Sequence, residues 1–119
     1  MPTITVKDGA SFDVEQGKRL ILALRDNDVD ILHRCGGNAK CTTCRVKIES
    51  GDPDQMTVAE RDRLEAAELL GEVRLSCQIQ CNYDMTVEPL MSQASEGLDN
   101  PGSRPKDDIT PEPEWVEAP

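Results

Sequence analysis

The sequence is poor in aromatic residues, in histidine and in positive charge. Phe12, Tyr83 and Trp115 are its three aromatic side chains, and His33 is its single histidine. Lysine and arginine number 13 against 23 aspartates and glutamates, which gives a formal net charge of -10. Such an excess of negative charge is repelled by nucleic acid and by anionic membrane surfaces. We therefore expect no nucleic-acid partner, and we expect protein partners with basic docking surfaces.

Long apolar runs are also absent from the sequence. No stretch approaches the ~18 consecutive apolar residues that a membrane-spanning helix needs. The first ten residues, MPTITVKDGA, lack the basic start and apolar run of a secretory leader. We therefore expect a cytoplasmic protein without membrane insertion. At 119 residues, the chain has room for one folded domain, which we expect to be a monomer.

The composition changes at Ser92. From there on the sequence reads SQASEGLDNPGSRPKDDITPEPEWVEAP, rich in Pro, Ser and acidic residues and without apolar periodicity. Segments of this composition bury too little apolar surface to fold. The sequence thus predicts a folded domain at residues 1–91 and a disordered, acidic, Pro-rich tail at 92–119. Trp115 is unusual there: it is either a stray residue of a solubilising tail or an anchor for a partner.

Hydrophobic periodicity divides residues 1–91 into strands and helices. β-prone runs predict strands at residues 3–6, 11–14, 45–49, 73–79 and 85–90. Helical spacing of leucine and isoleucine predicts a helix at 18–27. Thr57 and Glu60 form a capping box for a second helix, which Gly71 would end. This order of elements predicts an α+β fold with a mixed sheet and one main helix across it.

Cysteine is the most informative residue type in the chain. Five cysteines without an export signal argue against a disulfide framework and favour metal ligands or redox groups. Three of them lie in the glycine-rich run CGGNAKCTTC and a fourth lies in RLSCQ, so the four-thiolate set is Cys35, Cys41, Cys44 and Cys77.

Four thiolates suit two kinds of tetrahedral metal site. A two-iron, two-sulfide cluster takes two thiolates on each iron, whereas a structural zinc takes all four. Zinc sites usually pair two short C-x2-C knuckles, and here only Cys41 and Cys44 form one. That pair is disfavoured as a thiol-disulfide centre because it precedes a strand instead of opening a helix. A Rieske centre is excluded because it needs two histidines.

The loop between the first and third cysteines has donors that suit inorganic sulfide. Gly36 and Gly37 lack Cβ atoms, so their backbone N–H groups can approach a sulfide closely. We expect these N–H groups and the hydroxyls of Thr42 and Thr43 to stabilise the negative charge added on reduction.

The strings CGGNAKCTTCRVKI and RLSCQI resemble the [2Fe-2S] ferredoxins of the β-grasp fold, over residues 3–91. The five-residue gap between the first two cysteines is similar to that of the adrenodoxin group. Both strings are more similar to free-standing bacterial ferredoxins and to the ferredoxin domain of sodium-translocating NADH-quinone reductase. Arg45 departs from the adrenodoxin pattern, which usually has a histidine there.

The resemblance implies a fold, a cofactor and a function. The fold is a β-grasp (ubiquitin-like) mixed sheet with one main helix, a second short helix and a cluster-binding loop. One [2Fe-2S] cluster per chain would be held by Cys35, Cys41, Cys44 and Cys77. The protein would be an electron carrier and not an enzyme with its own substrate. It would accept an electron from a flavin-containing reductase or another low-potential donor and pass it to a terminal redox enzyme.

An alternative function belongs to a different class. A zinc-stapled or metal-free β-grasp binding module would recruit a partner through its acidic tail. The sequence contains no flavin- or nicotinamide-binding region, so under either interpretation we expect any reductase to be a separate protein.

Acidic side chains on the second predicted helix form a candidate docking surface. At 3.6 residues per turn they lie within about a third of the helix circumference. A solvated helix face also explains them, whereas the resemblance to adrenodoxin-like ferredoxins, which meet partners through an acidic helix in this region, favours docking. The residues are Asp62, Glu65, Glu68 and Glu72.

Two other residues near the cysteine set need an interpretation. Cys81 would lie about 13 Å from Cys77 along an extended strand, too far to share its iron. We expect a small buried hydrophobe at Cys81, with an alternative ligand or a redox-sensitive thiol as the second interpretation. We expect His33 to be a partly exposed polar residue.

Overall fold

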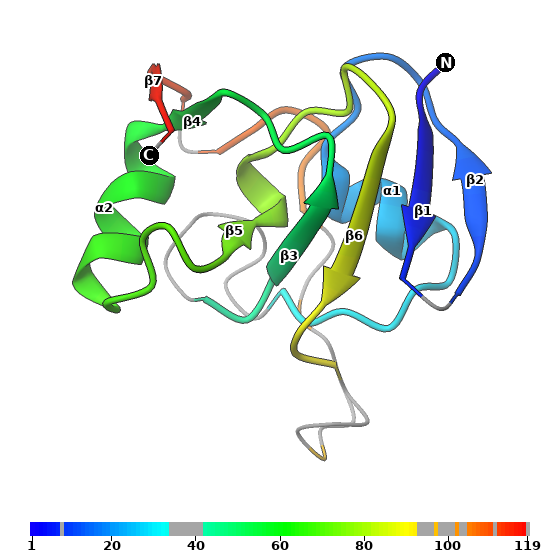
Figure 1. The fold of residues 1–119 in the computed structure, drawn as a ribbon, viewed down its shortest axis with the longest axis horizontal. Coiled ribbons are helices and arrows are strands. Elements are labelled where there is room, and N and C mark those ends of the chain that lie inside the picture. Colours follow the sequence, from blue (N-terminus) through cyan, green and yellow to red (C-terminus); the bar gives the residue numbers. More distant parts are fainter. Residues whose placement is uncertain are drawn as a thin grey trace.

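A mixed five-stranded sheet forms the centre of the computed structural model (Figure 1), which describes residues 1–7, 9–33, 42–92, 97, 102, 105–110 and 112–118. The strand order is β2-β1-β6-β3-β5. The bounds are β1 (Thr3–Val6), β2 (Ser11–Asp13), β3 (Arg45–Ser50), β5 (Arg74–Leu75) and β6 (Met85–Pro89). β1 and β6 are parallel, and the other neighbours are antiparallel.

Helices and a small second sheet complete the fold. In Figure 1, α1 (Leu20–Asp26) lies behind β1 and β6, and α2 (Val58–Ala66) lies beyond β5. A 3-10 turn, η1 (Ser76–Gln78), follows β5 directly. β4 (Gln55–Thr57) pairs with β7 (Trp115–Glu117) in a separate two-stranded sheet. No helix in the described ranges is long and apolar enough to cross a bilayer.

The α1 helix is the centre of the hydrophobic core. Its first five residues, Leu20–Leu24 in the run LILAL, are all buried, so the helix is covered all round and not on one stripe alone. Contacts with η1 help to cover it, and the Leu20 N–H donates to the Ile79 carbonyl at 2.8 Å. Each buried leucine or isoleucine stabilises the fold by roughly 1.5–3 kcal/mol, which offsets the scarcity of aromatic side chains.

The second helix is shorter than predicted. Thr57 is its N-cap, as expected, and accepts a hydrogen bond from the Glu60 N–H at 3.0 Å. The helix ends at Ala66 and not near Gly71. Glu68 adopts a positive φ of 60°, and the Leu69 N–H bonds back to the Leu64 carbonyl at 2.8 Å. This is a Schellman ending without glycine, and the packing of Leu69 against the core accounts for it.

The strand predicted at residues 73–79 is correct only for Arg74 and Leu75. The chain turns into η1 at Ser76, so the extended geometry assumed between Cys77 and Cys81 does not hold throughout. β4 and β7 were not predicted, because three-residue strands give too little alternation to detect.

Residues 92–119 were predicted to be disordered, whereas the structure packs residues 105–110 and 112–118 against the domain. β7 pairs with β4 in the register Met56↔Val116, and the Ala118 N–H donates to the Asp54 carbonyl at 2.8 Å. Ile109 is buried. Single apolar residues between prolines give no periodicity, yet the β4 edge offers them a place to pair. The domain boundary at residue 91 stays a prediction.

We predict that Gly51→Ala lowers the free energy of unfolding by about 2–4 kcal/mol. Gly51 follows β3 with a φ of +77°, and an added Cβ would collide with the Asp84 carbonyl oxygen. Gly71→Ala is the matched control, because Gly71 has a φ of +83° with nothing within 4 Å of its Cβ position. Its expected cost is about 1 kcal/mol. Urea unfolding followed by circular dichroism measures both, and equal costs would contradict the collision.

Candidate functional site

Two of the four candidate ligands are among the described residues. Cys44 immediately precedes β3, and Cys77 lies in η1; both are buried. Cys35 and Cys41 lie outside the described residues, as do Gly36 and Gly37. The geometry of the site is therefore that of its Cys44 and Cys77 side.

The pairing of β3 with β5 brings these two cysteines together. Arg45 faces Leu75 in the antiparallel register, so the next pair of positions is Cys44 and Ser76. Ser76 donates twice to the Cys44 carbonyl, from its backbone N–H at 3.2 Å and from its hydroxyl at 2.8 Å. Two segments that are 32 residues apart in sequence are thereby held side by side, and Cys77 is the next residue.

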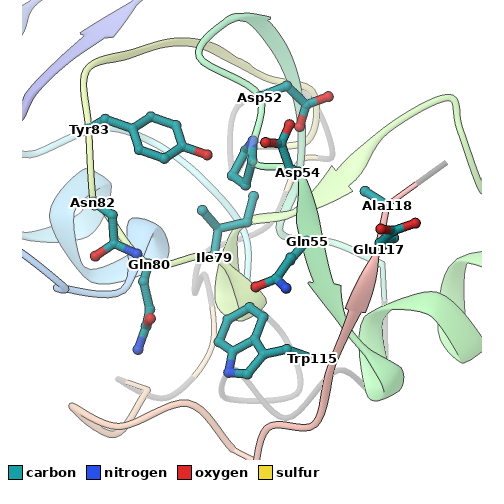
Figure 2. Close-up of a pocket in the computed structure, with 11 residues that line it drawn as sticks. Asp52, Asp54, Gln55, Ile79, Gln80, Asn82, Tyr83, Trp115, Glu117 and Ala118 are labelled. Atoms are coloured by element: carbon teal, nitrogen blue, oxygen red, sulfur yellow. The ribbon is translucent and has the colours of Figure 1, made fainter.

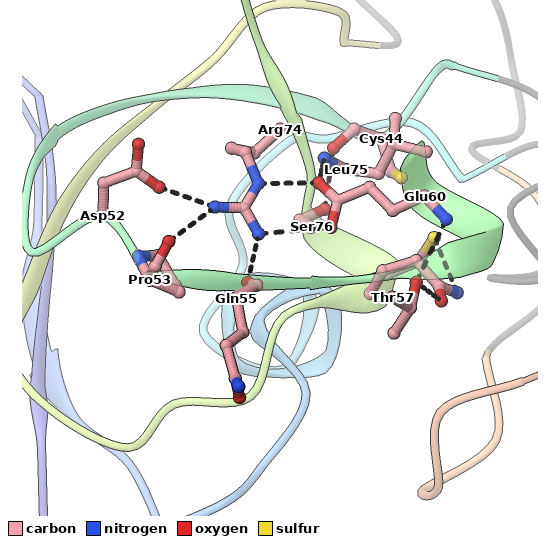
Figure 3. A network of polar contacts seen from close by, with 11 residues as sticks. Cys44, Asp52, Pro53, Gln55, Thr57, Glu60, Arg74, Leu75 and Ser76 are labelled. Carbon is pink, nitrogen blue, oxygen red and sulfur yellow. Dashed lines mark hydrogen bonds and ion pairs between the residues drawn. The ribbon is translucent and has the colours of Figure 1, made fainter. Parts of the chain in front are cut away.

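A buried ion pair holds this junction from the side of α2 (Figure 3). The Arg74 guanidinium donates to both carboxylate oxygens of Glu60, at 2.8 and 3.2 Å, and to Asp52 at 2.7 Å. Glu60 also accepts from the Leu75 N–H at 2.9 Å. Burial alone would lower the pKa of Arg74, but the hydrogen bonds and charges of Glu60 and Asp52 outweigh it and raise the pKa.

This ion pair revises the predicted capping box. The Glu60 carboxylate is used by Arg74 and Leu75, so the reciprocal bond of a capping box to the Thr57 N–H is not its role here. Half of the box, the Thr57 hydroxyl on the Glu60 N–H, is confirmed. The consequence is that α2 is fixed to β5 immediately before Cys77.

A second arginine, Arg19, holds the backbone of Cys77. Its side chain is 1% exposed, and its Nε and Nη2 donate to the Cys77 carbonyl at 3.0 and 2.6 Å. Its Nη1 donates to the carbonyls of Lys106 and Asp108 at 2.7 and 3.1 Å. Sequence reasoning missed Arg19, because nothing in a single arginine before a helix indicates a bond to a residue 58 positions away.

The sulfur of Cys77 has a hydrogen-bond donor. The Gln78 Nε2 lies 3.6 Å from the Cys77 Sγ. A buried cysteine with a donor on its sulfur and a cation on its carbonyl suits a thiolate ligand, because both interactions stabilise negative charge. The residues on this side of the site therefore fit a metal or iron-sulfur centre.

Arg45 stands where the adrenodoxin pattern usually has a histidine, and its side chain bonds to Thr42 in the turn before β3. Its Nε donates to the Thr42 carbonyl at 2.8 Å, and its Nη2 donates to the Thr42 hydroxyl. The Thr42 hydroxyl oxygen thus accepts a hydrogen bond in this structure. The donor role expected of the same hydroxyl concerns its proton and is a separate interaction. The guanidinium fixes the residues just before Cys44.

Cys81 and His33 are both buried. The burial predicted for Cys81 is confirmed, and its backbone bonds to Lys18 and Gly17 and not to the strands of the sheet. Burial raises the pKa of its thiol to about 12, against a smaller lowering by Lys18. The partial exposure expected of His33 is wrong: its side chain is 1% exposed. Gly102 packs so closely on it that an added Cβ would collide with the His33 carbonyl.

The four acidic candidates for docking are all exposed. Asp62 and Glu65 lie on α2, whereas Glu68 and Glu72 lie in the turn after it, so the four do not share one helical face. Arg61 forms an exposed ion pair with Asp62 at 3.4 Å.

A groove of about 920 Å³ lies near the C-terminal strand (Figure 2). The rings of Tyr83 and Trp115 stand on either side of Ile79, and Asp54 and Glu117 add carboxylates. Trp115 is therefore held in β7 and not carried on a free tail. Neither cysteine nor histidine lines the groove among the described residues, so it is separate from the candidate thiolate site.

Known proteins resemble this chain in sequence. Residues 4–82 match the family model described as 2Fe-2S iron-sulfur cluster binding domain. A component of the Na(+)-translocating NADH-quinone reductase from Shewanella denitrificans is 39% identical over 72 residues, which is 60% of this chain and 17% of that protein. Its counterpart from Neisseria gonorrhoeae is 33% identical over 86 residues, which is 72% of this chain and 21% of that protein. The chain spans about a fifth of the length of these relatives.

Solved structures resemble the chain in fold. The ISC-like [2Fe-2S] ferredoxin FdxB from Pseudomonas putida has a TM-score of 0.62 and 26% identity, covering 76% of this chain and 93% of that one. A reduced variant of putidaredoxin from the same organism has a TM-score of 0.55 and 29% identity, covering 76% and 96%. The Amycolatopsis cytochrome P450 reductase GcoB has a TM-score of 0.60 and 25% identity, covering 76% and 26%.

We predict that Cys81 is not alkylated in the folded protein. With a pKa of about 12, the thiol is protonated at pH 8, and the thiolate is the reactive form. Iodoacetamide treatment at pH 8 followed by peptide mapping should find Cys81 unmodified before unfolding in urea and modified after it. Because the raised pKa means that the unfolded thiol ionises first, the fold loses stability as the pH rises from 9 toward 12. Equal alkylation rates before and after unfolding would contradict this assignment.

Proposed function

Because this chain belongs to the family of 2Fe-2S iron-sulfur cluster binding domains, we propose that it is a one-electron carrier that takes electrons from a flavin-containing reductase or another low-potential donor and passes them to a terminal redox enzyme. Its general role is ferredoxin-type electron transfer with one [2Fe-2S] cluster. Its α+β fold is the β-grasp fold, as the resemblance implied. The observation that carries the proposal is the family match over residues 4–82, which includes all four candidate ligands.

Ferredoxins and reductases both resemble this chain, which supports an electron-transfer role. The chain covers 93% of FdxB and 96% of the putidaredoxin variant, but 26% of GcoB and about a fifth of the NADH-quinone reductase components. These last two relatives are named as a reductase and as components of one, which supports a reductase as the electron donor. Under this proposal the protein turns over no substrate of its own. Its cytoplasmic location and monomeric state stay predictions.

We propose Cys35, Cys41, Cys44 and Cys77 as the cluster ligands. Support comes from the two that the structure describes, which are buried and held side by side by Ser76. Arg19 fixes the Cys77 backbone, and Arg45 fixes the turn before Cys44. When bound, the cluster supplies reversible one-electron chemistry. The contacts of Ser76, Arg19 and Arg45 hold Cys44 and Cys77 in place, which limits the rearrangement of this side of the site during electron transfer.

The zinc-stapled or metal-free binding module is not favoured. The family to which the chain belongs binds a 2Fe-2S cluster. The tail that would recruit a partner in that alternative is packed on the domain over 105–110 and 112–118, through β7 and through Arg19.

The first test is the metal content of anaerobically purified protein. We expect two irons and two acid-labile sulfides per chain, and no zinc. Cys77→Ser should abolish the cluster or distort its visible spectrum. Cys81→Ala is the control and should leave the iron and sulfide content and the visible spectrum unchanged. One zinc without sulfide would overturn the electron carrier, and the reverse result for the two variants would overturn the ligand set.

We also propose an acidic docking surface, formed by Asp62, Glu65, Glu68 and Glu72. All four reach solvent, on α2 and the turn after it. A protein of net charge -10 meets basic partners faster when its negative charge is gathered near the docking site.

The docking surface is tested by charge neutralisation. Changing Glu65, Glu68 and Glu72 to glutamine should slow reduction by a flavin-containing ferredoxin reductase about tenfold at low ionic strength, and flatten the salt dependence of the rate. Stopped-flow absorbance of the cluster measures this.

The control changes the same net charge elsewhere in the domain. Asp13→Asn and Glu15→Gln alter exposed acids in and just after β2, at the opposite edge of the sheet from β5, and Asp28→Asn alters an exposed acid just after α1. If both triple variants slow the reaction equally, net charge and not the surface is responsible.

A further inference from the structure

Gln78 connects the sulfur of Cys77 to two other parts of the fold. Its side chain is 0% exposed, and its Nε2 lies 3.6 Å from the Cys77 Sγ and 2.8 Å from the Thr110 carbonyl oxygen. Its Oε1 accepts from the Thr57 hydroxyl at 2.7 Å. One buried amide therefore joins a candidate ligand to the N-cap of α2 and to the stretch 105–110, here called the C-terminal stretch.

Chemistry fixes the orientation of this amide. The Thr110 carbonyl can only accept a hydrogen bond. The Thr57 oxygen already accepts from the Glu60 N–H at 3.0 Å, which directs its own proton to Gln78 Oε1. A flipped amide would place its oxygen against two acceptors, the Thr110 oxygen and the Cys77 sulfur. An N–H group therefore faces the sulfur.

The C-terminal stretch contacts Cys77 through a second residue. Arg19 donates to the Cys77 carbonyl and, with its Nη1, to the carbonyls of Lys106 and Asp108. Buried Ile109 lies between these contacts and Thr110. The stretch is thus anchored by an apolar side chain and reaches Cys77 at its carbonyl through Arg19 and at its sulfur through Gln78.

From this geometry we propose that Gln78 tunes the cluster through its hydrogen bond to the Cys77 sulfur, and that the C-terminal stretch is the positioning element that keeps the amide aimed. The proposal rests on the proposed role of Cys77 as a ligand. Reduction adds one negative charge to the centre, part of which resides on the ligand sulfurs. An N–H donor stabilises the reduced form more than the oxidised form, so it raises the reduction potential.

The direct test is Gln78→Met, which keeps the length of the side chain and removes the donor. We expect two irons and two sulfides per chain, a lower midpoint potential and a shifted Fe–S stretching band in the resonance Raman spectrum. Gln80→Met is the matched control, because Gln80 lies two residues along and lines the groove of Figure 2. It should leave the potential and the Raman band unchanged.

Two truncations test the role of the C-terminal stretch. A chain ending at residue 111 loses β7 but keeps the Thr110 carbonyl, whereas a chain ending at residue 104 loses the carbonyls of Lys106, Asp108 and Thr110 that hold Arg19 and Gln78 from this side. We expect the potential to fall only in the chain that ends at residue 104. In the chain that ends at residue 104, Gln78→Met should lower the reduction potential by less than it does in the full chain. The truncation and the substitution both act through the hydrogen bond from Gln78 to the Cys77 sulfur, so their effects do not add.

The outcomes separate this proposal from the proposed function. An unchanged potential and Raman band in cluster-bearing Gln78→Met would overturn the proposal and leave the electron carrier intact. Absence of iron and sulfide in the unmodified protein would overturn the proposed function instead. If Gln78→Met holds no cluster, Gln78→Asn, which keeps the amide and withdraws it by one methylene, decides by the same two measurements.

Discussion

The antiparallel pairing of β3 with β5 is the contact on which the candidate site depends. It places Cys44 opposite Ser76 and so delivers Cys77 beside Cys44. β5 has only two residues, Arg74 and Leu75, so the strand ladder alone supplies few hydrogen bonds. Side chains supplement it: Ser76 bonds to the Cys44 carbonyl, and Glu60 bonds to the Leu75 N–H. Without them, two residues of pairing would define the relative position of the two cysteines.

Two buried arginines hold the same junction through different parts of the chain. Arg74 holds α2 and the loop before β4, and Arg19 holds the start of α1 and the C-terminal stretch. Each donates to backbone carbonyl groups, which keeps those buried acceptors satisfied. The core of this domain is almost entirely aliphatic, and polar networks of this kind add rigidity at the junction beside it. Rigid ligands favour rapid electron transfer, since less of the surroundings must rearrange.

The C-terminal stretch and β7 show where composition misleads. Their prolines, acids and single apolar residues are those of an unfolded segment. Yet the domain offers them specific partners: a strand edge at β4, the guanidinium of Arg19 and the amide of Gln78. These partners are in place only once the domain has folded. Composition describes what a segment does alone and carries no information about the groups that a folded domain presents to it.

The sequence by itself determined the cofactor class and most of the elements. The spacing of Cys35, Cys41, Cys44 and Cys77 predicts a four-thiolate centre, and the alternation of β-prone and helical runs predicts the α+β order, because both are local patterns. The tertiary structure alone decided the early end of α2, the burial of His33, and the bonds of Arg19 and Gln78 to Cys77. Each of these depends on groups brought together from distant parts of the chain. A buried polar group needs a hydrogen-bond partner, and the fold determines which group becomes that partner.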